Sequence, residues 1–456
     1  RIFGIAHQHA RAQVCRGDVV KLKLAFSLLA AVGMNLQAAD SIPVPARGKV
    51  IGTYVLPRLS LSQFGNPDCS DAVLARARQN GLKFTDLPSI GSGLAHVRSD
   101  EFVGITDRGP NGLVLDGGEE RHTFPLPEFC PTIVRFTLAE GKIRPTEFIP
   151  LTGSDGRRIT GLSNMKGDGH LYEFAARKKP LPYDQNGIDP ESVRIFPDGG
   201  FLVGEEYAPS LLVVSPKGEI RMRYTPVSRP VAGARYPTKA ILPAIFAQRR
   251  DNRGFENLAL SRDGRFAYAI LQGPMGDDQD KRFEKSRIVR ILKLDVADPL
   301  NLKVVGEYLA RTSPAKEFRD KTNQRFVSWS DAEWIAPDVL VVSERGHGEV
   351  KLQLVDLRDA TNVLGRKDES GLIYENVSAD LAALGIKPAV CREVFSTRDT
   401  PGINNDKIEG ITVLNATDIA LANDNDFGIG ENPNGEPSQI WIVRLASPLP
   451  VENAGR

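Results

Sequence analysis

The chain has 456 residues, a formal net charge of +1, 41% hydrophobic residues and 25% charged residues. These proportions are ordinary for a folded globular protein, and they exclude collagen, a disordered charged chain and a small disulfide-rich scaffold. A near-neutral chain also lacks the basic excess that binding along a phosphate backbone requires, so nucleic acid is not an expected partner. The length fits two or three domains or one large β domain.

The first 39 residues have the pattern of an export signal. A short basic stretch precedes an apolar run over residues 24–34, and small residues follow up to Ala39. Basic, apolar, small is the order of a secretory signal, and the run is shorter than the roughly 20 residues that span a bilayer. We therefore predict no membrane span, cleavage near Ala39 and a periplasmic or secreted protein, with residues 1–19 as upstream sequence. The alternative is a buried N-terminal helix.

Three cysteines follow the predicted signal: Cys69, Cys130 and Cys391. An exported protein meets an oxidising compartment, where three cysteines allow at most one internal disulfide. We predict the pair Cys69–Cys130, and three buried thiols are the alternative.

Five repeats dominate the rest of the chain. A strand over residues 49–56 and a helix over residues 71–80 come first. The repeats then occupy residues 91–109, 189–207, 254–273, 330–346 and 407–426. Each has a short opening motif, an apolar strand, a turn rich in Gly and Asp and a second strand that ends in polar residues. A third strand candidate follows every repeat.

Repeated antiparallel hairpins without alternating helices predict an all-β protein. A β-propeller fits best, because radial sheets leave only short edges. We predict one propeller domain over residues 40–456, with five visible blades, a possible sixth and long inter-strand insertions. One insertion is expected to form a helix over residues 378–384. The strand at residues 49–56 should close the ring against the last blade.

The polar residues of the repeats are expected to meet at one end of the channel. In an antiparallel hairpin, the start of the first strand and the end of the second lie at the same edge. The opening glutamates should therefore lie beside the closing polar groups. The expected neighbours are Glu191 with Glu205 and Glu206, Glu256 with Gln272, Glu333 with Glu344, and Glu409 with Asn423 and Asp424.

A ring of carboxylates repels itself, and a hard divalent cation, Ca²⁺ above all, would neutralise it through oxygen ligands. Basic side chains lie within three residues of these acids, at Arg108, Arg253, Arg345 and Lys407. Arginine offers a planar fork that suits phosphate oxygens. His347 follows one polar cluster and could act as a general acid or base, or simply lie in a surface loop. The alternative for any single acid is a structural role.

Four segments carry a resemblance to a known family: DPESVRIFPDGGFLVGEEY, NRGFENLALSRDGRFAYAI, SDAEWIAPDVLVVSERGHG and KIEGITVLNATDIALANDND. They resemble the phytase-like domain family, also described as having esterase-like activity of phytase. The resemblance covers nearly all of the chain after the signal, and it implies phosphoester hydrolysis. When the acidic site residues of the family are transferred to this chain, the resemblance implies that they are Asp107, Glu191, Glu206, Glu256, Glu333, Glu344, Glu409 and Asp424. The first repeat departs in having Gly93-Leu94, and the third in having Gln272.

We therefore expect an exported, metal-dependent phosphoester hydrolase that acts as a monomer on a small-molecule phosphoester. The expected metal ligands are Asp107, Glu191, Glu206, Glu256 and Asp424. The expected substrate-binding residues are Arg108, Arg253, Arg345 and Lys407, and the expected catalytic residues are Glu333, Glu344, Glu409 and His347. The alternatives are a non-catalytic propeller that binds a ligand or protein on the same face, and a Ca²⁺-dependent lactonase.

Overall fold

The computed structural model describes residues 48–452, apart from residues 66–68, 117, 165–169, 174–179, 278, 321, 367–371, 406 and 431. The predicted export signal lies outside the described residues. Within the described part, no helix has the length and apolar character needed to cross a membrane.

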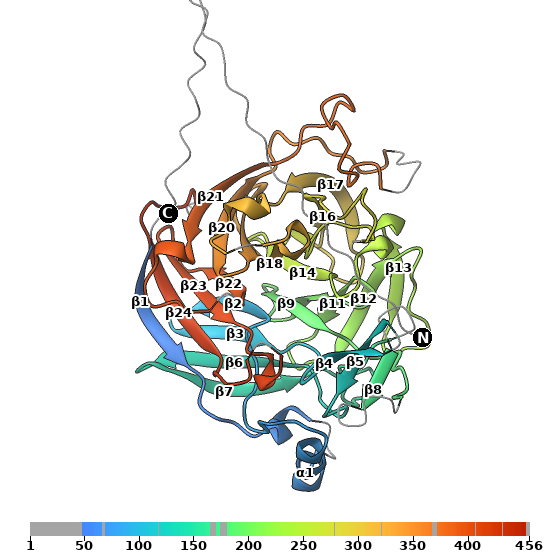
Figure 1. Ribbon diagram of the computed structural model, residues 1–456, viewed down its shortest axis with the longest axis vertical. Coiled ribbons are helices and arrows are strands. Elements are labelled where there is room, and N and C mark those ends of the chain that lie inside the picture. The colour runs from blue at the N-terminus through green and yellow to red at the C-terminus, as the bar shows by residue number, and fades with distance from the viewer. Residues whose placement is uncertain are drawn as a thin grey trace, which may run out of the picture. The chain divides into compact units, whose positions relative to one another are not determined.

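Twenty of the strands form five four-stranded antiparallel blades that follow one another around a circle (Figure 1). The outer strands of the first and last blades also meet, at the parallel pair Val55↔Lys142, so that these two blades share one eight-stranded sheet. Blade 1 contains β2 (Gly93–Arg98), β3 (Glu101–Ile105), β6 (Thr132–Ala139) and β7 (Lys142–Pro150). Blade 2 contains β9 (Pro190–Ile195), β10 (Phe201–Glu205), β11 (Ser210–Val214) and β12 (Ile220–Pro226), and β13 (Thr238–Leu242) adds to its edge in parallel. Blade 3 contains β14 (Phe255–Leu260), β15 (Phe266–Leu271), β16 (Ile288–Asp295) and β17 (Lys303–Arg311). Blade 4 contains β18 (Ser328–Ala336), β19 (Val339–Gly346), β20 (Glu349–Asp356) and β21 (Val390–Ser396). Blade 5 contains β22 (Ile408–Val413), β23 (Asp418–Asn423), β24 (Gln439–Leu445) and β1 (Gly48–Val55).

The ring closes with five blades. The innermost strands contact one another in the circular order β2, β9, β14, β18, β22 and back to β2. The last blade takes its outer strand from the start of the chain, because β1 pairs antiparallel with β24 from Gly48↔Leu445 to Val55↔Gln439. The predicted propeller and the closing role of the strand at residues 49–56 are thus confirmed. The described residues contain no sixth blade.

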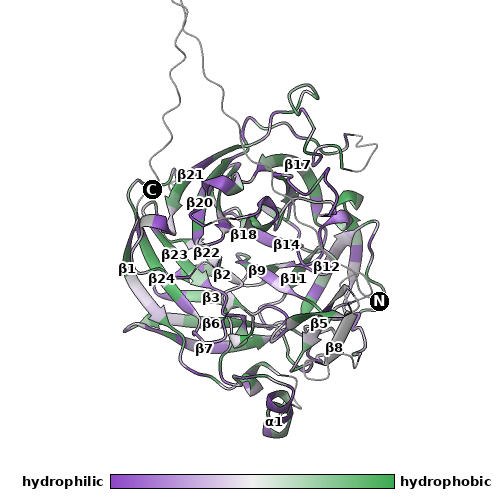
Figure 2. Cartoon of the chain, in the orientation of Figure 1, coloured by the Kyte–Doolittle hydropathy of each residue, from purple (hydrophilic) through white to green (hydrophobic). Residues whose placement is uncertain are grey.

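The blades are held together by apolar residues between neighbouring sheets. Hydrophobic residues lie along the strands of the blades (Figure 2), and five of the buried clusters draw on strands of more than one blade. Local turn chemistry fixes the hairpins: in the turn between β9 and β10, Gly199 has a φ of +85° and Asp198 Oδ1 accepts a hydrogen bond from Gly200 N at 2.9 Å. Glycine adopts that backbone conformation without a steric penalty.

Insertions between strands carry the remaining elements. Between β3 and β6, β4 (Gly112–Asp116) and β5 (Glu119–Phe124) form a hairpin, to which β8 (His170–Glu173) adds in parallel. The α-helix α1 (Asp71–Gln79) confirms the helix expected at residues 71–80. The short 3₁₀ helices are η1 (Leu61–Phe64), η2 (Ala244–Gln248), η3 (Ala315–Glu317), η4 (Gln324–Phe326), η5 (Thr397–Asp399) and η6 (Asp426–Gly428).

Two local predictions are wrong. Residues 378–384 form turns rather than a helix, because the side chains of Asn376 and Asp380 accept backbone hydrogen bonds locally and hold the segment in turns. The disulfide between Cys69 and Cys130 is absent, and all three cysteines are free thiols. Cys130 is fully buried and its Sγ faces the carbonyl oxygen of Leu151 at 3.5 Å.

Candidate metal centre at one end of the channel

A β-bulge recurs at the start of the inner strand of blades 2 to 5. The pairing with the second strand skips one residue in each case, and the skipped residues are Glu191, Glu256, Ser330 and Glu409. In blade 1, Ser92 holds the corresponding place, because its neighbours Gly91 and Gly93 both pair with Ile105. A bulge turns the extra residue out of the ladder and re-aims its side chain. The bulges therefore direct one polar side chain per blade toward the same end of the channel.

The second strand of each blade adds another polar residue at the same end. In blades 2 to 5 it stands one position beyond the residue that faces the start of the bulge, which gives Glu206, Gln272, Arg345 and Asp424. In blade 1 the corresponding residue is Asp107, two positions beyond Ile105. We call this set, together with the five bulge residues, the mouth. Its six carboxylates are each less than a tenth exposed.

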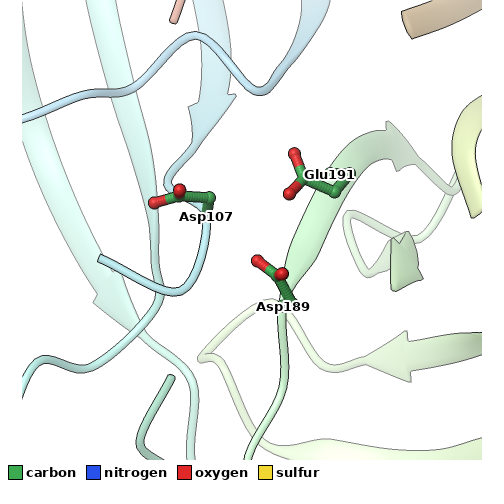
Figure 3. Close-up of side chains that lie close together, drawn as sticks. All are labelled: Asp107, Asp189 and Glu191. Atoms are coloured by element: carbon green, nitrogen blue, oxygen red, sulfur yellow. The ribbon is translucent and has the colours of Figure 1, made fainter. Parts of the chain in front are cut away.

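Two mouth acids, Asp107 and Glu191, form a close group with Asp189, which lies beside the mouth (Figure 3). Asp107 follows β3, while Asp189 and Glu191 lie at the start of β9 in the next blade. Ligand oxygens of the three side chains all lie within 4.8 Å of one another. Asp189 was not among the predicted site residues, although it opens the second repeat as Asp189-Pro190-Glu191, only two residues before Glu191.

Basic side chains neutralise part of the mouth. Arg108 Nε lies 3.0 Å from Asp189 Oδ2, and Arg108 Nη2 lies 3.3 Å from Glu206 Oε2. Arg345 Nη1 contacts Glu409 Oε1 at 2.9 Å.

Three further cations complete the mouth. Lys407 Nζ forms ion pairs with Asp424 and Asp426. Burial and then Glu409 raise the pKa of Glu256 well above its usual range, and the positive charge of Arg253 is one of the groups that oppose this rise. Arg249 also acts electrostatically on Glu206. The mouth acids together with Asp189 and Asp426 number eight, against five cations, so the fully ionised group carries a charge of −3.

Burial and mutual repulsion disfavour ionisation of these acids. Burial, followed by the charge of Asp189, raises the pKa of Glu206 to about 8. Burial also raises the pKa of Glu409 to about 7, although Lys407 and Arg345 oppose it. The pKa of Glu191 is raised well above its usual range, first by burial and then by Asp189 and other mouth acids. Burial, Asp424 and Asp189 do the same to the pKa of Asp107.

Asp424 behaves in the opposite way. Burial also works against its ionisation, but Lys407 and the hydroxyl of Ser89 outweigh that penalty and lower its pKa to about 2. The mouth therefore combines one firmly ionised acid with several that a metal ion or a proton must neutralise.

Two carboxylates retain free oxygens. No described residue donates a hydrogen bond or forms an ion pair with Glu191, and Glu256 Oε2 is also without a hydrogen bond. A buried, unpaired carboxylate is costly, and an oxygen-rich group of this kind suits a hard divalent cation such as Ca²⁺. The donor set that fits such an ion is Asp107, Asp189 and Glu191.

The structure removes Glu333 from the predicted ring. Glu333 lies three residues beyond the bulge of β18 and accepts a hydrogen bond from Thr412 Oγ1 at 2.9 Å. Thr412 stands near the end of β22, whereas Glu409 stands near its start, so Glu333 lies toward the opposite end of the channel. Ser330 occupies the place that the sequence analysis gave to Glu333. The prediction was wrong because it aligned the repeats by their glutamates, whereas the position of the β-bulge sets the register.

Glu344 and Glu205 are held inside their own blades. Glu344 accepts hydrogen bonds from Trp329 Nε1 at 3.0 Å and from Gln353 Nε2 at 2.9 Å. Glu205 Oε2 pairs with Arg223 Nη2 at 2.8 Å, and both side chains are fully buried. Both carboxylates are thus occupied by partners within their blades, which indicates a structural role for Glu344 and Glu205.

His347 is exposed in the turn between β19 and β20. It stacks on Phe326 with ring centroids 5.4 Å apart. None of its described contacts involves a mouth residue.

The fold and the site together define a five-bladed β-propeller with an acidic, buried mouth. Residues 89–427 match the model of the phytase-like family, described as esterase-like activity of phytase. The chain therefore belongs to the phytase-like family, as its repeats predicted.

Individual relatives are more distant. An uncharacterized secreted protein of Arthroderma benhamiae is 27% identical over 182 residues, which are 34% of this chain and 36% of that protein. The match thus spans about a third of the length of that curated relative. Among solved structures, a luciferin-regenerating enzyme is 9% identical with a TM-score of 0.35, covering 80% of this chain and 94% of that chain. A periplasmic gluconolactonase of Pseudomonas aeruginosa is 13% identical with a TM-score of 0.30, covering 80% and 87%. Similarity at this level does not define a shared activity.

Proposed function

We propose that this protein is an exported, divalent-cation-dependent phosphoester hydrolase whose active site is the mouth. The observation that carries the proposal is the group Asp107, Asp189 and Glu191, three buried carboxylates from two blades with ligand oxygens within 4.8 Å. Membership in the phytase-like family supports the ester-hydrolase class, and the secreted relative supports export.

The three carboxylates would hold the cation, with Glu206, Glu256 and Glu409 nearby to balance its charge. A bound Ca²⁺ ion would supply Lewis acidity toward a phosphoryl oxygen and toward water. The side chains of this chain fix where the ester lies.

The mouth cations would orient the phosphate. Arg108, Arg345 and Lys407 are paired with mouth acids. When a divalent cation shares Asp189, the guanidinium of Arg108 is less strongly bound by that internal partner and can donate to phosphate oxygens. A planar guanidinium donates two parallel hydrogen bonds, which sets the orientation of the ester before water attacks.

The proposal is tested with purified protein on p-nitrophenyl phosphate, bis-p-nitrophenyl phosphate and phytate, with added Ca²⁺ or with EDTA. We expect hydrolysis of at least one phosphoester that EDTA abolishes and Ca²⁺ restores. Asp189→Asn should reduce that activity strongly. Glu101→Gln is the matched control, because Glu101 begins β3 at the end opposite Asp107 and is solvent-exposed beside Arg98.

Other outcomes decide between the alternatives. Calcium binding without hydrolysis of any phosphoester would favour a binding module that uses the same face. Hydrolysis of a lactone but of no phosphoester would favour the lactonase. Failure of the protein to bind Ca²⁺ or another divalent cation in isothermal titration would refute the metal centre.

A further inference from the structure

Buried side chains close the channel between its two ends. Asp331 Oδ1 on β18 accepts hydrogen bonds from Ser192 Oγ at 2.9 Å and from Arg194 Nη2 at 2.8 Å, both on β9. Asp331 Oδ2 accepts one from Ile411 N on β22 at 3.0 Å. Arg194 Nη1 donates to the carbonyl oxygen of Leu94 on β2 at 2.9 Å. These bonds join the inner strands of four blades across the axis, so the other end of the channel is separate from the mouth.

A cavity of about 640 Å³ lies beyond these side chains, and we call it the far cavity. Its size is typical of sites for small molecules. All five inner strands, which surround the centre of the ring in Figure 1, contribute to its wall. The contributing residues include His96 on β2, Arg194 on β9, Leu260 on β14, Trp334 on β18 and Thr412 on β22. The bulge residues of the mouth stand at the starts of the same strands, so the far cavity lies at the opposite end of the channel.

Arg194 brings an unused donor to the far cavity. Its side chain is only 4% exposed. The two Nη atoms are taken up by Leu94 and Asp331, whereas Nε is buried and forms no hydrogen bond with any described residue. A buried donor without a partner is costly, and an oxygen atom of a ligand in the cavity would satisfy it.

Glu333 brings an acceptor that is held in place. The backbone nitrogen of His96 donates to Thr412 Oγ1 at 3.2 Å, and that hydroxyl donates to Glu333 Oε2 at 2.9 Å. All three residues line the far cavity. A carboxylate accepts several hydrogen bonds at once, so Glu333 retains capacity for the hydroxyl groups of a ligand.

Trp334 adds an aromatic surface to the same wall. Its indole is half-buried, because it packs against the apolar cluster between blades 3 and 4 and also lines the far cavity. An indole combines a large apolar face with little conformational freedom to lose on binding. The far cavity therefore offers a donor, an acceptor and a flat apolar face.

The charges of the far cavity cancel. Among its Asp, Glu, Lys and Arg side chains, two are cations, Arg194 and Arg262, and two are carboxylates, Glu333 and Glu452. A ligand with a net charge would lose its hydration without a compensating charge, so this lining favours a neutral molecule. Sugars fit, because hydroxyl groups both donate and accept hydrogen bonds and the C–H face of a sugar ring is apolar.

We propose that the far cavity is a binding site for a neutral sugar, a mono- or disaccharide. A sugar oxygen accepts from Arg194 Nε, a hydroxyl group donates to Glu333, and a face of the sugar ring packs on Trp334. The site is separate from the mouth, and the inference does not depend on the function proposed there.

Tryptophan fluorescence tests binding directly. The chain has three tryptophans, and Trp329 and Trp441 are almost completely buried, so Trp334 is the one that a ligand in the far cavity reaches. The full chain is titrated with D-glucose, D-galactose, D-xylose, maltose and cellobiose. We expect a saturable change with at least one sugar, at a Kd of about 1 mM or tighter. Trp441→Phe should keep the change, and Trp334→Phe should abolish it.

Isothermal titration with the same sugar measures the contribution of the acceptor. Glu333→Gln should weaken binding at least about tenfold, because a hydrogen bond to a charged group is lost. Glu147→Gln is the matched control, since Glu147 lies on the outer strand β7 and is exposed. Asp189→Asn should also bind the sugar as wild type does, because Asp189 belongs to the candidate metal centre at the other end of the channel.

Several results would overturn the proposal. One is the absence of any fluorescence change with all five sugars at ten times the expected Kd. Another is a change that persists in Trp334→Phe, or wild-type affinity in Glu333→Gln. Loss of sugar binding in Asp189→Asn would place the sugar at the mouth instead. A response to sodium acetate or inorganic phosphate, but to no sugar, would show that the far cavity takes an anion. Each of these results leaves the test of phosphoester hydrolysis unaffected.

Discussion

Calcium should stabilise the protein against heat, and Glu191→Gln should weaken that effect. Glu191 is a mouth carboxylate that accepts no hydrogen bond and forms no ion pair with any described residue, and it belongs to the close group with Asp107 and Asp189. Its replacement by glutamine keeps the size of the side chain and removes the charge. The variant therefore isolates the contribution of one anionic ligand to the candidate metal centre.

The size of the effect follows from linkage. A ligand present at a hundredfold excess over its dissociation constant stabilises the folded state by about 2.7 kcal/mol. For ~400 residues at about 2.1 cal/mol/K per residue, the unfolding entropy is roughly 0.85 kcal/mol/K, so Tm should rise by about 3 °C. Each tenfold loss of affinity removes about 1.4 kcal/mol, which is about 1.6 °C of that rise.

Differential scanning calorimetry at a fixed free Ca²⁺ concentration measures both quantities. Two further variants provide an internal comparison: Glu409→Gln should shrink the calcium-dependent rise, whereas Glu333→Gln should leave it unchanged, because Glu333 lies toward the other end of the channel. The reasoning is refuted if Ca²⁺ leaves the Tm of the wild-type protein unchanged, or if all three variants respond to Ca²⁺ as wild type does.

Three other predictions concern pH, a buried ion pair and processing. Because the folded-state pKa values of Glu206 and Glu409 are raised from 4.5 to about 8 and about 7, folding favours their protonated forms. Their stabilisation is fully present below pH ~4.5 and is lost as the pH rises through 7 to 8. The Tm of EDTA-treated protein should therefore fall as the pH rises from about 4.5 to about 8. A Tm that does not change over this pH range would contradict the raised pKa values. Arg223→Met should cost about 3–5 kcal/mol by leaving Glu205 buried and unpaired, and adding Glu205→Gln should recover part of the loss in urea titrations. Amino-terminal sequencing of exported protein should find a start near residue 40, and a full-length cytosolic product would reject export.

Much of the fold could be predicted because it depends on local patterns. Alternating apolar residues and turns such as Pro197-Asp198-Gly199-Gly200 are signals read within one hairpin, and the structure places those hairpins as predicted. Because the hairpins are similar in sequence, each is expected to pack against its neighbours in a similar way. A β-propeller places every blade in such an equivalent position. The closing strand could be predicted because the first and last strands of the chain lacked partners elsewhere.

The composition of the mouth could be predicted only in part. The sequence showed that acidic residues stand at the ends of paired strands, which correctly brought Glu191, Glu206, Glu256 and Glu409 together. It did not show where each inner strand bulges. That register is a property of the pairing between strands, and it put Ser330 at the channel end in place of Glu333.

Which polar groups remain unpaired depends on contacts that the local sequence does not reveal. Glu205 and Glu206 are adjacent in sequence. Glu205 forms an ion pair with Arg223 inside blade 2, whereas Glu206 lies in the mouth beside Arg108. Asp189 gained its importance from Asp107 in a different blade, about 80 residues away. The repeat, the strands and the number of available carboxylates follow from the sequence alone, because these depend on local residue types. Contacts between blades decided which carboxylates meet, because those distances depend on how the whole ring closes.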